Sequence, residues 1–546
     1  MRATSSFVSC LAVILATAVV THGQERHTHR PGDDASRLGT VAFANSGADA
    51  AQAPFLRGLA LLHSFEYDEA AEAFRAAQAA DPGFAMAFWG EAVTYSHLLW
   101  GEDDVDGARR ALNRLAPSRD ARLARAKTAR EQAYGAAVEA LFADGDLSMR
   151  VRGFAEAMRG VTAKYPDDID AAAFTSLALM FAGNVGQLPP DQRQTARGDA
   201  ITFAQRVFTA NPTHPGGVHY LIHATDDPEL APRGLEAARR YAEIAPEAEH
   251  ALHMPSHIFV QLGLWSDAVA SDERAFAASR AEVTARKLSN ADLSFHSLQW
   301  LQYAYLQSGR YRAARGTIDT AREVLAGVDL SVPTYTDARY TVGWLTFQHA
   351  AITGDWSGAV CDQRSAVRPP QAKVSDREQS FSNAASYQAA IAVVMCDREA
   401  TAIEALRKRV AELPAGPHPL RMALLHAELL TYIAGKPPAN LDILLADPST
   451  PPRAPVGPPP TLRHEELLGQ ARLKAGRPQE AIAAYERALR LTPNRSNALL
   501  GLARARRAAG DGQGAAEAYR RLLDNWRSAD PDVPALKEAR EGASSK

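Results

Sequence analysis

Three landmark positions recur with a period of 34 residues near the end of this 546-residue chain. The first copy has Gly476, Ala481 and Tyr485, and the second has Gly510, Ala515 and Tyr519. In a repeated helix-turn-helix unit, small residues let two helices approach and an aromatic ring fills the remaining space. One such unit cannot bury its apolar face alone, so neighbouring units must stack. The recurrence therefore predicts an all-α solenoid.

The same template fits other parts of the chain. Near the N-terminus it matches Gly58, Ala70, Phe74, Ala77 and Pro82, and in the middle it matches the triplets that begin at Gly263, Gly309 and Gly354. The length and spacing are those of the tetratricopeptide repeat. Amphipathic patterns with a helical period continue between the matches, and no run of residues has the pattern of a strand. We expect about 10–12 helical pairs from this pattern.

The N-terminal segment has the pattern of a secretory signal peptide. Arg2 precedes a short apolar run, Phe7 to Val20, and small residues follow it, so we assign residues 1–23 to the signal. A retained membrane anchor is the alternative. No later segment has the ~20 consecutive apolar residues that span a bilayer. We therefore expect an exported protein, periplasmic or secreted.

The mature chain divides into four segments by composition. Residues 24–50 are polar and predict a flexible lead-in, and residues 51–446 form the main solenoid. Residues 447–460 include seven prolines, which cannot continue a helix. This linker is expected to join the main solenoid to a short unit of two repeats, 461–546.

Net charge and cysteine content narrow the possible partners and the fold. The formal net charge is −3, and no cluster of Lys or Arg dominates a segment, which disfavours a nucleic-acid partner. Beyond the signal peptide only Cys361 and Cys396 remain. Export permits a disulfide between them, and two buried thiols on adjacent helices are the alternative.

Four histidines share the repeat period. His219 and His223 are four residues apart, as are His253 and His257, and 34 residues separate the two pairs. A spacing of four places two side chains on one helix face. Because 34 is the repeat length, the second pair occupies the equivalent positions of the next repeat. The four imidazoles are therefore predicted to meet at one patch of the concave groove.

Two further histidines fall in the same register. When Pro246, Gly263 and Gly309 set the register, His250 and His296 also project from first helices toward this patch. Both are candidates for an additional ligand. Pro255 is a complication, because it must kink the helix between His253 and His257 or delay its start.

Neutral imidazole is a ligand for zinc, copper, iron or nickel, with bonds of about 2.0–2.1 Å to zinc. We therefore predict a transition-metal site (Zn, Cu or Fe) at His219, His223, His253 and His257. Asp226 and Asp227, at the end of the first helix, are candidates to orient the rings or to join the site. The alternative is a polar groove without metal. His63 and His97 are also 34 residues apart, but beside aromatic residues they are better explained as packing residues.

Catalytic motifs are scarce. The two HxxxH segments lack the glutamate that serves as general base in zinc metallopeptidases. The sequence contains no nucleophile elbow, phosphate-binding loop or dinucleotide fingerprint. Nothing in the sequence therefore requires an enzyme, and no catalytic residue is assigned.

Several longer segments resemble a family of bacterial exported tetratricopeptide repeat proteins. The similarity is carried by HPGGVHYLIHATDDP at 214–228, HALHMPSHIFVQLGLW at 250–265 and FLRGLALLHSFEYDEAAEAF at 55–74. The resemblance implies an α-solenoid and export, and it implies no activity.

Three functional hypotheses follow. The first is an exported solenoid that binds a protein or peptide in its groove and holds a transition metal at the four histidines. The second is a metal-free interaction scaffold whose histidines grip a partner. The third is a metalloenzyme, oxidative or hydrolytic, which needs an open coordination position.

Overall fold

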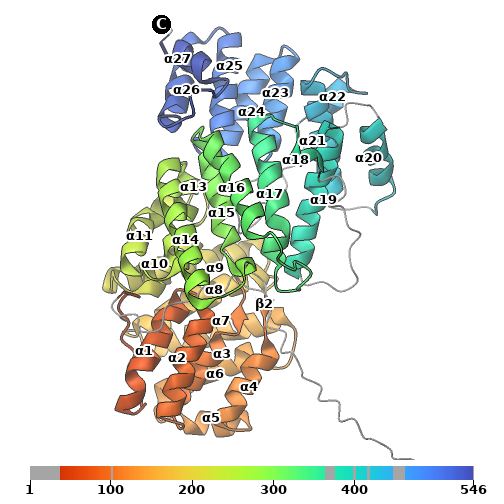
Figure 1. Cartoon of the computed structure of the whole chain (residues 1–546). Coiled ribbons are helices and arrows are strands. Elements are labelled where there is room, and N and C mark those ends of the chain that lie inside the picture. Colours follow the sequence, from red (N-terminus) through yellow and green to blue (C-terminus); the bar gives the residue numbers. More distant parts are fainter. Residues whose placement is uncertain are drawn as a thin grey trace, which may run out of the picture.

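The chain folds into paired helices that stack along a curved array from α1 to α27 (Figure 1). This computed structural model describes residues 37–99, 102–362, 376–396, 401–414, 418–446 and 461–544. Over these ranges the predicted all-α solenoid is confirmed. The predicted signal peptide and the proline-rich linker lie outside the described residues.

The N-terminal half contains α1 to α9 and one short β-ribbon. The helices are α1 (Asp49–His63), α2 (Tyr67–Ala80), α3 (Ala85–Val93), α4 (Val105–Leu115), α5 (Arg119–Arg125), α6 (Ala129–Leu141), α7 (Leu147–Lys164), α8 (Ile169–Val185) and α9 (Pro190–Ala210). The ribbon pairs β1 (Ser96–His97) with β2 (Glu102–Asp103) in antiparallel register, with Ser96 opposite Asp103.

The middle of the array carries the histidine-rich segments. Its helices are α10 (Pro215–Thr225), α11 (Ala231–Ile244), α12 (Glu249–His253), α13 (Pro255–Leu262), α14 (Trp265–Arg286), α15 (Phe295–Gln307), α16 (Tyr311–Val324) and α17 (Thr336–Thr353), with a 3₁₀ turn at Asn290–Asp292.

The remaining helices complete the array toward the C-terminus, which lies at the top of Figure 1. They are α18 (Ala359–Asp362), α19 (Asp376–Cys396), α20 (Thr401–Ala411), α21 (Pro419–Ile433), α22 (Leu441–Leu444), α23 (His464–Lys474), α24 (Pro478–Leu491), α25 (Ser496–Ala508), α26 (Gly512–Asn525) and α27 (Leu536–Ser544).

The landmark residues of the repeat pack as their sizes require. The ring of Tyr485, on α24, lies between Gly469 on α23 and Gly501 on α25. A Cβ atom would come within 2.8 Å of the ring at Gly469 and 2.1 Å at Gly501. Any larger residue would therefore push the three helices apart. This close approach explains why small residues flank the recurring tyrosine. The recurring glycines Gly476 and Gly510 have φ +72° and +84°, a left-handed conformation that favours glycine just after a helix.

The C-terminal helices pack directly on the middle of the array. Arg495, which is 1% exposed, donates hydrogen bonds to Glu466 at 2.7 Å and to the hydroxyl of Tyr303 on α15 at 2.7 Å. The indole nitrogen of Trp265 on α14 donates to the backbone oxygen of Asn494 at 2.9 Å. Residues about 190 to 230 positions apart are thus held together. Residues 461–544 therefore continue the stack, rather than lying apart from it.

The two cysteines of the mature chain form a disulfide. Cys361 at the end of α18 and Cys396 at the end of α19 have Cα atoms 5.6 Å apart, and their sulfur atoms are bonded. Of the two alternatives left open by the sequence, the structure has the disulfide. It joins the ends of α18 and α19.

Candidate metal centre

The six histidines singled out by the sequence lie on the first helices of three successive pairs. His219 and His223 are on α10, His250 and His253 are on α12, and His257 and His296 are on α13 and α15. The helical register predicted from the proline and glycine landmarks thus brings all six to one region.

Pro255 divides the second of these helices, as expected. The chain ends α12 at His253, passes through Met254 and starts α13 at Pro255. Both segments keep nearly the same direction, because Met254 itself has helical backbone angles (φ −53°, ψ −33°). His253 and His257 therefore still face one another, with their Nε2 atoms 3.0 Å apart.

The first histidine set consists of His219, His223 and His250. Each offers one ring nitrogen, and the three nitrogens lie within 4.8 Å of one another. The Nε2 atoms of His219 and His250 are 3.1 Å apart. Bonds of 2.0–2.1 Å to one ion at tetrahedral or trigonal angles place the nitrogens about 3.3–3.6 Å apart. The first set is thus close to the geometry of a three-imidazole site.

The second histidine set consists of His253, His257 and His296. Its three ligand nitrogens also lie within 4.8 Å of one another. The ring of His253 is central, with centroids 4.9 Å from His257 and 4.8 Å from His296. The second set repeats the ligand chemistry of the first.

The structure sorts the predicted ligands differently from the expected four-histidine site. The predicted set of four is divided, with His219 and His223 in the first set and His253 and His257 in the second. His250 and His296, predicted as additional ligands, complete the two sets. The arrangement is two neighbouring groups of three, whose rings approach within 5.9 Å between His223 and His257.

Outer hydrogen bonds fix the direction of the ligand rings. The Nδ1 atom of His219 donates to the backbone oxygen of His63 at 2.7 Å. The Nδ1 atom of His257 lies 2.9 Å from the Asp226 carboxylate, to which it donates. Each ring thereby carries its proton on Nδ1, and each Nε2 presents a lone pair to the centre of its set.

Asp272 holds the ring of His253. Its carboxyl group lies 2.7 Å from the Nδ1 atom of that histidine. Asp272 is fully buried on α14, and this burial, together with the charge of Glu249, holds its pKa well above the usual range. A cation in the second set would stabilise the ionised form of this group.

The Nε2 atom of His223 has unused hydrogen-bonding capacity. It is buried and has no hydrogen-bond partner among the described residues. Burial, and then the neighbouring rings of His219, His257 and His296, hold the pKa of His223 well below its usual value. The imidazole is therefore neutral, which is the form that binds a metal. A buried ring nitrogen without a partner costs free energy that a metal bond would recover.

Aromatic rings enclose the two sets. Phe65 covers the first set, with its centroid 4.3 Å from that of His219 and 5.7 Å from that of His223. Trp300 stacks on His257 of the second set at 4.3 Å. Phe65 has φ +60°, a left-handed conformation that is uncommon for a bulky side chain. This strained turn after α1 aims the ring at the histidines.

Burial separates the ligand rings from the surface. His219, His250, His253 and His257 are each at most 2% exposed, whereas His223 and His296 are partly exposed. A partner in the groove would therefore reach only two of the six rings. The expected open histidine patch is instead a largely enclosed cluster.

A third group of potential ligands consists of His63, Asp170 and His214. The ring nitrogens of both histidines already make hydrogen bonds within the protein. Both histidines direct Nε2 to Asp170, at 3.1 Å and 3.3 Å. Their Nδ1 atoms are occupied by the hydroxyl of Tyr220 and the backbone nitrogen of Gly217. Burial lowers the pKa of His63 to about 4. This group forms a packed hydrogen-bond network, which agrees with a packing role for His63.

The sequence identified some outer residues and missed others. Asp226 contacts His257, as predicted. The carboxylate of Asp227 instead lies 3.8 Å from Arg197 and accepts a hydrogen bond from the backbone nitrogen of Glu229. Asp272 was missed because an acidic residue on a helix gives no signal of burial. The role of the His63 backbone oxygen has no sequence signal at all, since every residue carries a carbonyl.

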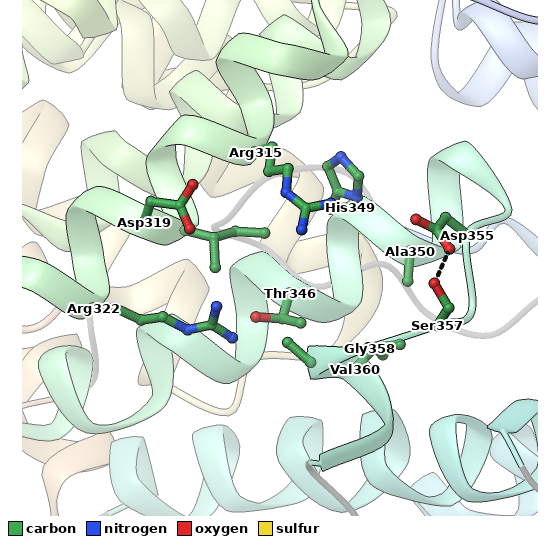
Figure 2. Close-up of a pocket in the computed structure, with 12 residues that line it drawn as sticks. Arg315, Asp319, Arg322, Thr346, His349, Ala350, Asp355, Ser357, Gly358 and Val360 are labelled. Atoms are coloured by element: carbon green, nitrogen blue, oxygen red, sulfur yellow. Dashed lines mark hydrogen bonds between the residues drawn. The ribbon is translucent and has the colours of Figure 1, made fainter.

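A separate pocket lies between α16 and α17 (Figure 2). Arg315, Asp319 and Arg322 line it from α16, and His349 lines it from α17. Burial and the charge of Arg315 lower the pKa of His349. The pocket mixes cationic and acidic groups at the surface and contains none of the six histidines.

Comparison with known families finds a similarity at both ends of the chain. A tetratricopeptide repeat profile matches residues 33–83 and 467–531. Both segments are similar to tetratricopeptide repeats. They include the landmark glycines, alanines and aromatics of α1, α2 and α23 to α26. A search of curated proteins finds no match.

Solved structures with low sequence identity are matched as well. A human IFIT1 dimer with m7Gppp-AAAA is 13% identical, over 89% of this chain and 96% of that one, with a TM-score of 0.36. The P58(IPK) TPR domain is 12% identical, over 91% and 98%, with a TM-score of 0.20. Yeast Tom70 is 10% identical, over 90% and 88%, with a TM-score of 0.25.

Within the described ranges, no helix combines the length and apolar character needed to cross a bilayer.

Proposed function

We propose that this chain is an exported α-solenoid that holds transition-metal ions in its two histidine sets. The proposal is supported chiefly by the convergence of Nε2 atoms. His219 and His257 present lone pairs, because their Nδ1 protons are donated to acceptors, and each faces another Nε2 at 3.0–3.1 Å. Each facing pair is joined by an N–H···N hydrogen bond, and a bound cation would take the place of the shared proton.

The composition of the cluster favours a transition metal over other cations. Every ligand atom in the two sets is an imidazole nitrogen. Calcium and magnesium prefer oxygen, whereas copper, zinc and iron bind imidazole. The enclosing rings of Phe65 and Trp300 keep the surroundings apolar and limit exchange with water.

The repeats also supply a surface for a protein or peptide partner, and the metal is proposed to organise the helices that form it. The metal-free scaffold is the second candidate, and it requires histidines that a partner can reach. Burial of four of the six rings weighs against that role. The absence of a nucleic-acid partner stays a prediction from the net charge of −3.

Elemental analysis of protein purified without a nickel column tests the proposal. We expect stoichiometric transition metal in the native chain. The double change His223→Ala and His257→Ala removes one ligand from each set and is expected to abolish stoichiometric binding. Metal that survives this double change would rule out the cluster as the site.

A matched control uses two histidines outside the sets. His97 and His349 are also partly exposed, and their replacement by alanine removes the same number of imidazoles. This control is expected to retain the full metal content. Circular dichroism of both variants verifies that the helices remain folded.

A further inference from the structure

Two arginines of α16 line the surface pocket between α16 and α17. Arg315 and Arg322 are seven residues apart, which places both side chains on the same face of the helix. Asp319 is on this face between them. Among the described residues, no carboxylate forms an ion pair with either guanidinium group. Both cationic groups are therefore available to a ligand in the pocket.

The opposite end of the pocket carries a carboxylate that its own turn holds in place. Figure 2 shows Arg322 and Asp355 at opposite ends, with Thr346 between them. Gly354 ends α17 in a left-handed conformation (φ +78°) and reverses the chain, so that Asp355 follows directly. The Asp355 carboxylate accepts a hydrogen bond from the hydroxyl of Ser357 at 2.5 Å. The turn and this bond together fix the direction of the carboxylate.

His349 lies between the opposite charges (Figure 2). The positive charge of Arg315 and the negative charge of Asp355 act on this ring in opposite directions. Burial is the largest cause that lowers the pKa of His349, so the imidazole is uncharged near pH 7. Among the described residues, Arg315 and Asp355 form no ion pair with each other. The pocket therefore keeps a cationic side and an anionic side apart, with an uncharged ring between them.

Apolar residues line the pocket from its buried side. Ile318 on α16, Ala350 on α17 and Val360 on α18 are all buried. The disulfide between Cys361 and Cys396 joins α18 to α19, so the short helix that carries Val360 is held against the array. The apolar side of the pocket is thus part of a fixed framework, and it offers contact to a small apolar group.

These features favour a small ligand that carries charges of both signs. The formal charges of the two arginines and of the two aspartates that line the pocket cancel. A ligand with a large net charge would leave that charge uncompensated. Guanidinium groups bind a carboxylate through paired hydrogen bonds, and a carboxylate accepts hydrogen bonds from an ammonium group. The space of about 490 Å³, part of it open solvent, limits the ligand to a small molecule.

We propose that the pocket between α16 and α17 binds a free amino acid with a short apolar side chain. Arg315 and Arg322 bind its carboxylate, and Asp355 accepts hydrogen bonds from its ammonium group. The apolar side chain lies against Ile318 and Val360. This site has no residue in common with the two histidine sets, so the inference is independent of the proposed metal binding.

Isothermal titration of the full chain with L-valine and two analogues tests the ligand class. Isovalerate has the carbon skeleton of valine without the ammonium group, and isobutylamine has it without the carboxylate. We expect saturable binding of one valine per chain at low ionic strength, where screening of surface charges is weak. Each analogue is expected to bind at least about 5-fold more weakly, because it leaves one side of the pocket without its hydrogen bonds.

Charge-removing variants locate the bound valine. Arg322→Gln removes a cationic group, and Asp355→Asn removes the anionic group while keeping an acceptor for the hydroxyl of Ser357. Each is expected to lower the affinity for valine by at least about 5-fold. Arg312→Gln and Glu323→Gln are the matched controls, because both residues are exposed on α16 outside the pocket. Both controls should bind valine as the unchanged chain does.

Three results would overturn the inference. The first is the absence of saturable valine binding by the unchanged chain, and the second is equal affinity for valine and isovalerate, since the ammonium group would then have no role. The third is unchanged valine affinity in both Arg322→Gln and Asp355→Asn, which would place the ligand elsewhere. Treatment with a chelator should leave valine binding intact, so the outcome for this pocket is separate from the outcome for the histidine sets.

Discussion

His219 and His250 face one another through their Nε2 atoms at 3.1 Å, although they lie on different helices and 31 residues apart. The proton of His219 is on the opposite side of its ring, where Nδ1 donates to the backbone oxygen of His63. The close pair is therefore oriented by α1, the first helix of the array. A residue far from the histidines in sequence thus controls the direction of a ligand.

Replacing Asp226 by asparagine should weaken metal binding. The carboxylate accepts the Nδ1 proton of His257 and accepts a bond from Gln261, and asparagine provides a neutral and weaker acceptor. Loss of such an outer partner typically lowers metal affinity by about 10–100-fold. Competition with a chelator measures the change. Asp227→Asn, one residue later, is the control, and an equal loss in both variants would contradict the role of Asp226.

Replacing Gly216 by alanine should disturb the first histidine set without removing a ligand. A Cβ at this position would lie 2.5 Å from Nδ1 of His63, so the ring or the end of α1 must move. The bond from His219 to the His63 carbonyl would then lengthen, and we expect metal affinity to fall by about 10-fold or more. Isothermal titration measures this change.

Gly198 supplies the control for that substitution. It lies within α9, and a Cβ there meets nothing within 4 Å. Alanine at this position should leave metal affinity unchanged and raise stability by about 0.5–1 kcal/mol, because glycine is a poor helix former. Equal metal affinity in both glycine variants would show that the end of α1 does not orient His219.

Replacing Arg495 by methionine should destabilise the C-terminal stack. The change leaves the carboxylate of Glu466, which is 4% exposed, without its ionic partner and removes the bond to Tyr303. Removal of one partner of a buried ion pair costs about 3–5 kcal/mol. Denaturant unfolding measures the loss. The exposed pair of Arg527 and Asp524 is the control, because its removal should cost less than about 1 kcal/mol.

His426 should make the fold sensitive to acid. Burial, and then the neighbouring His464, lower its pKa from 6.5 to about 3. Because the unfolded chain takes up this proton first, stability is complete above pH 6.5 and is lost as the pH falls toward 3. The slope is about 1.4 kcal/mol per pH unit.

Glutamine at position 426 removes this titration and can still accept the bond from Tyr387, which lies 2.6 Å from the imidazole. Between pH 6.5 and pH 4.5, the unchanged chain should lose about 2–3 kcal/mol more than His426→Gln. Urea unfolding at both pH values gives the difference. Parallel pH profiles would show that His426 is protonated in the folded chain.

The sequence predicted the fold through residues whose roles are local. Tyr485 and Tyr519 recur because an aromatic ring fills the space that small residues leave between neighbouring helices, and this relationship is visible at a fixed spacing. Landmark residues also predicted that the six histidines lie on the first helices of their repeats. Their helical register follows from proline and glycine landmarks, which act on the nearby backbone.

The sorting of the histidines into two sets was not predictable from spacing. The 34-residue period relates His219 to His253, whereas the structure pairs His219 with His250. The reason is that His250 lies three residues before His253 on α12, close to the same helix face. Packing between helices, which spacing does not specify, decides which of these two rings meets His219. The outer partner Asp272 depends on packing of α14, which no local pattern specifies.

Anomalous diffraction from crystals of the zinc-loaded chain tests the central claim most directly. The account predicts two peaks, one bonded to the Nε2 atoms of the first histidine set and one to the second. A single peak bonded to His219, His223, His253 and His257 together, or the absence of a peak among the six rings, would contradict it.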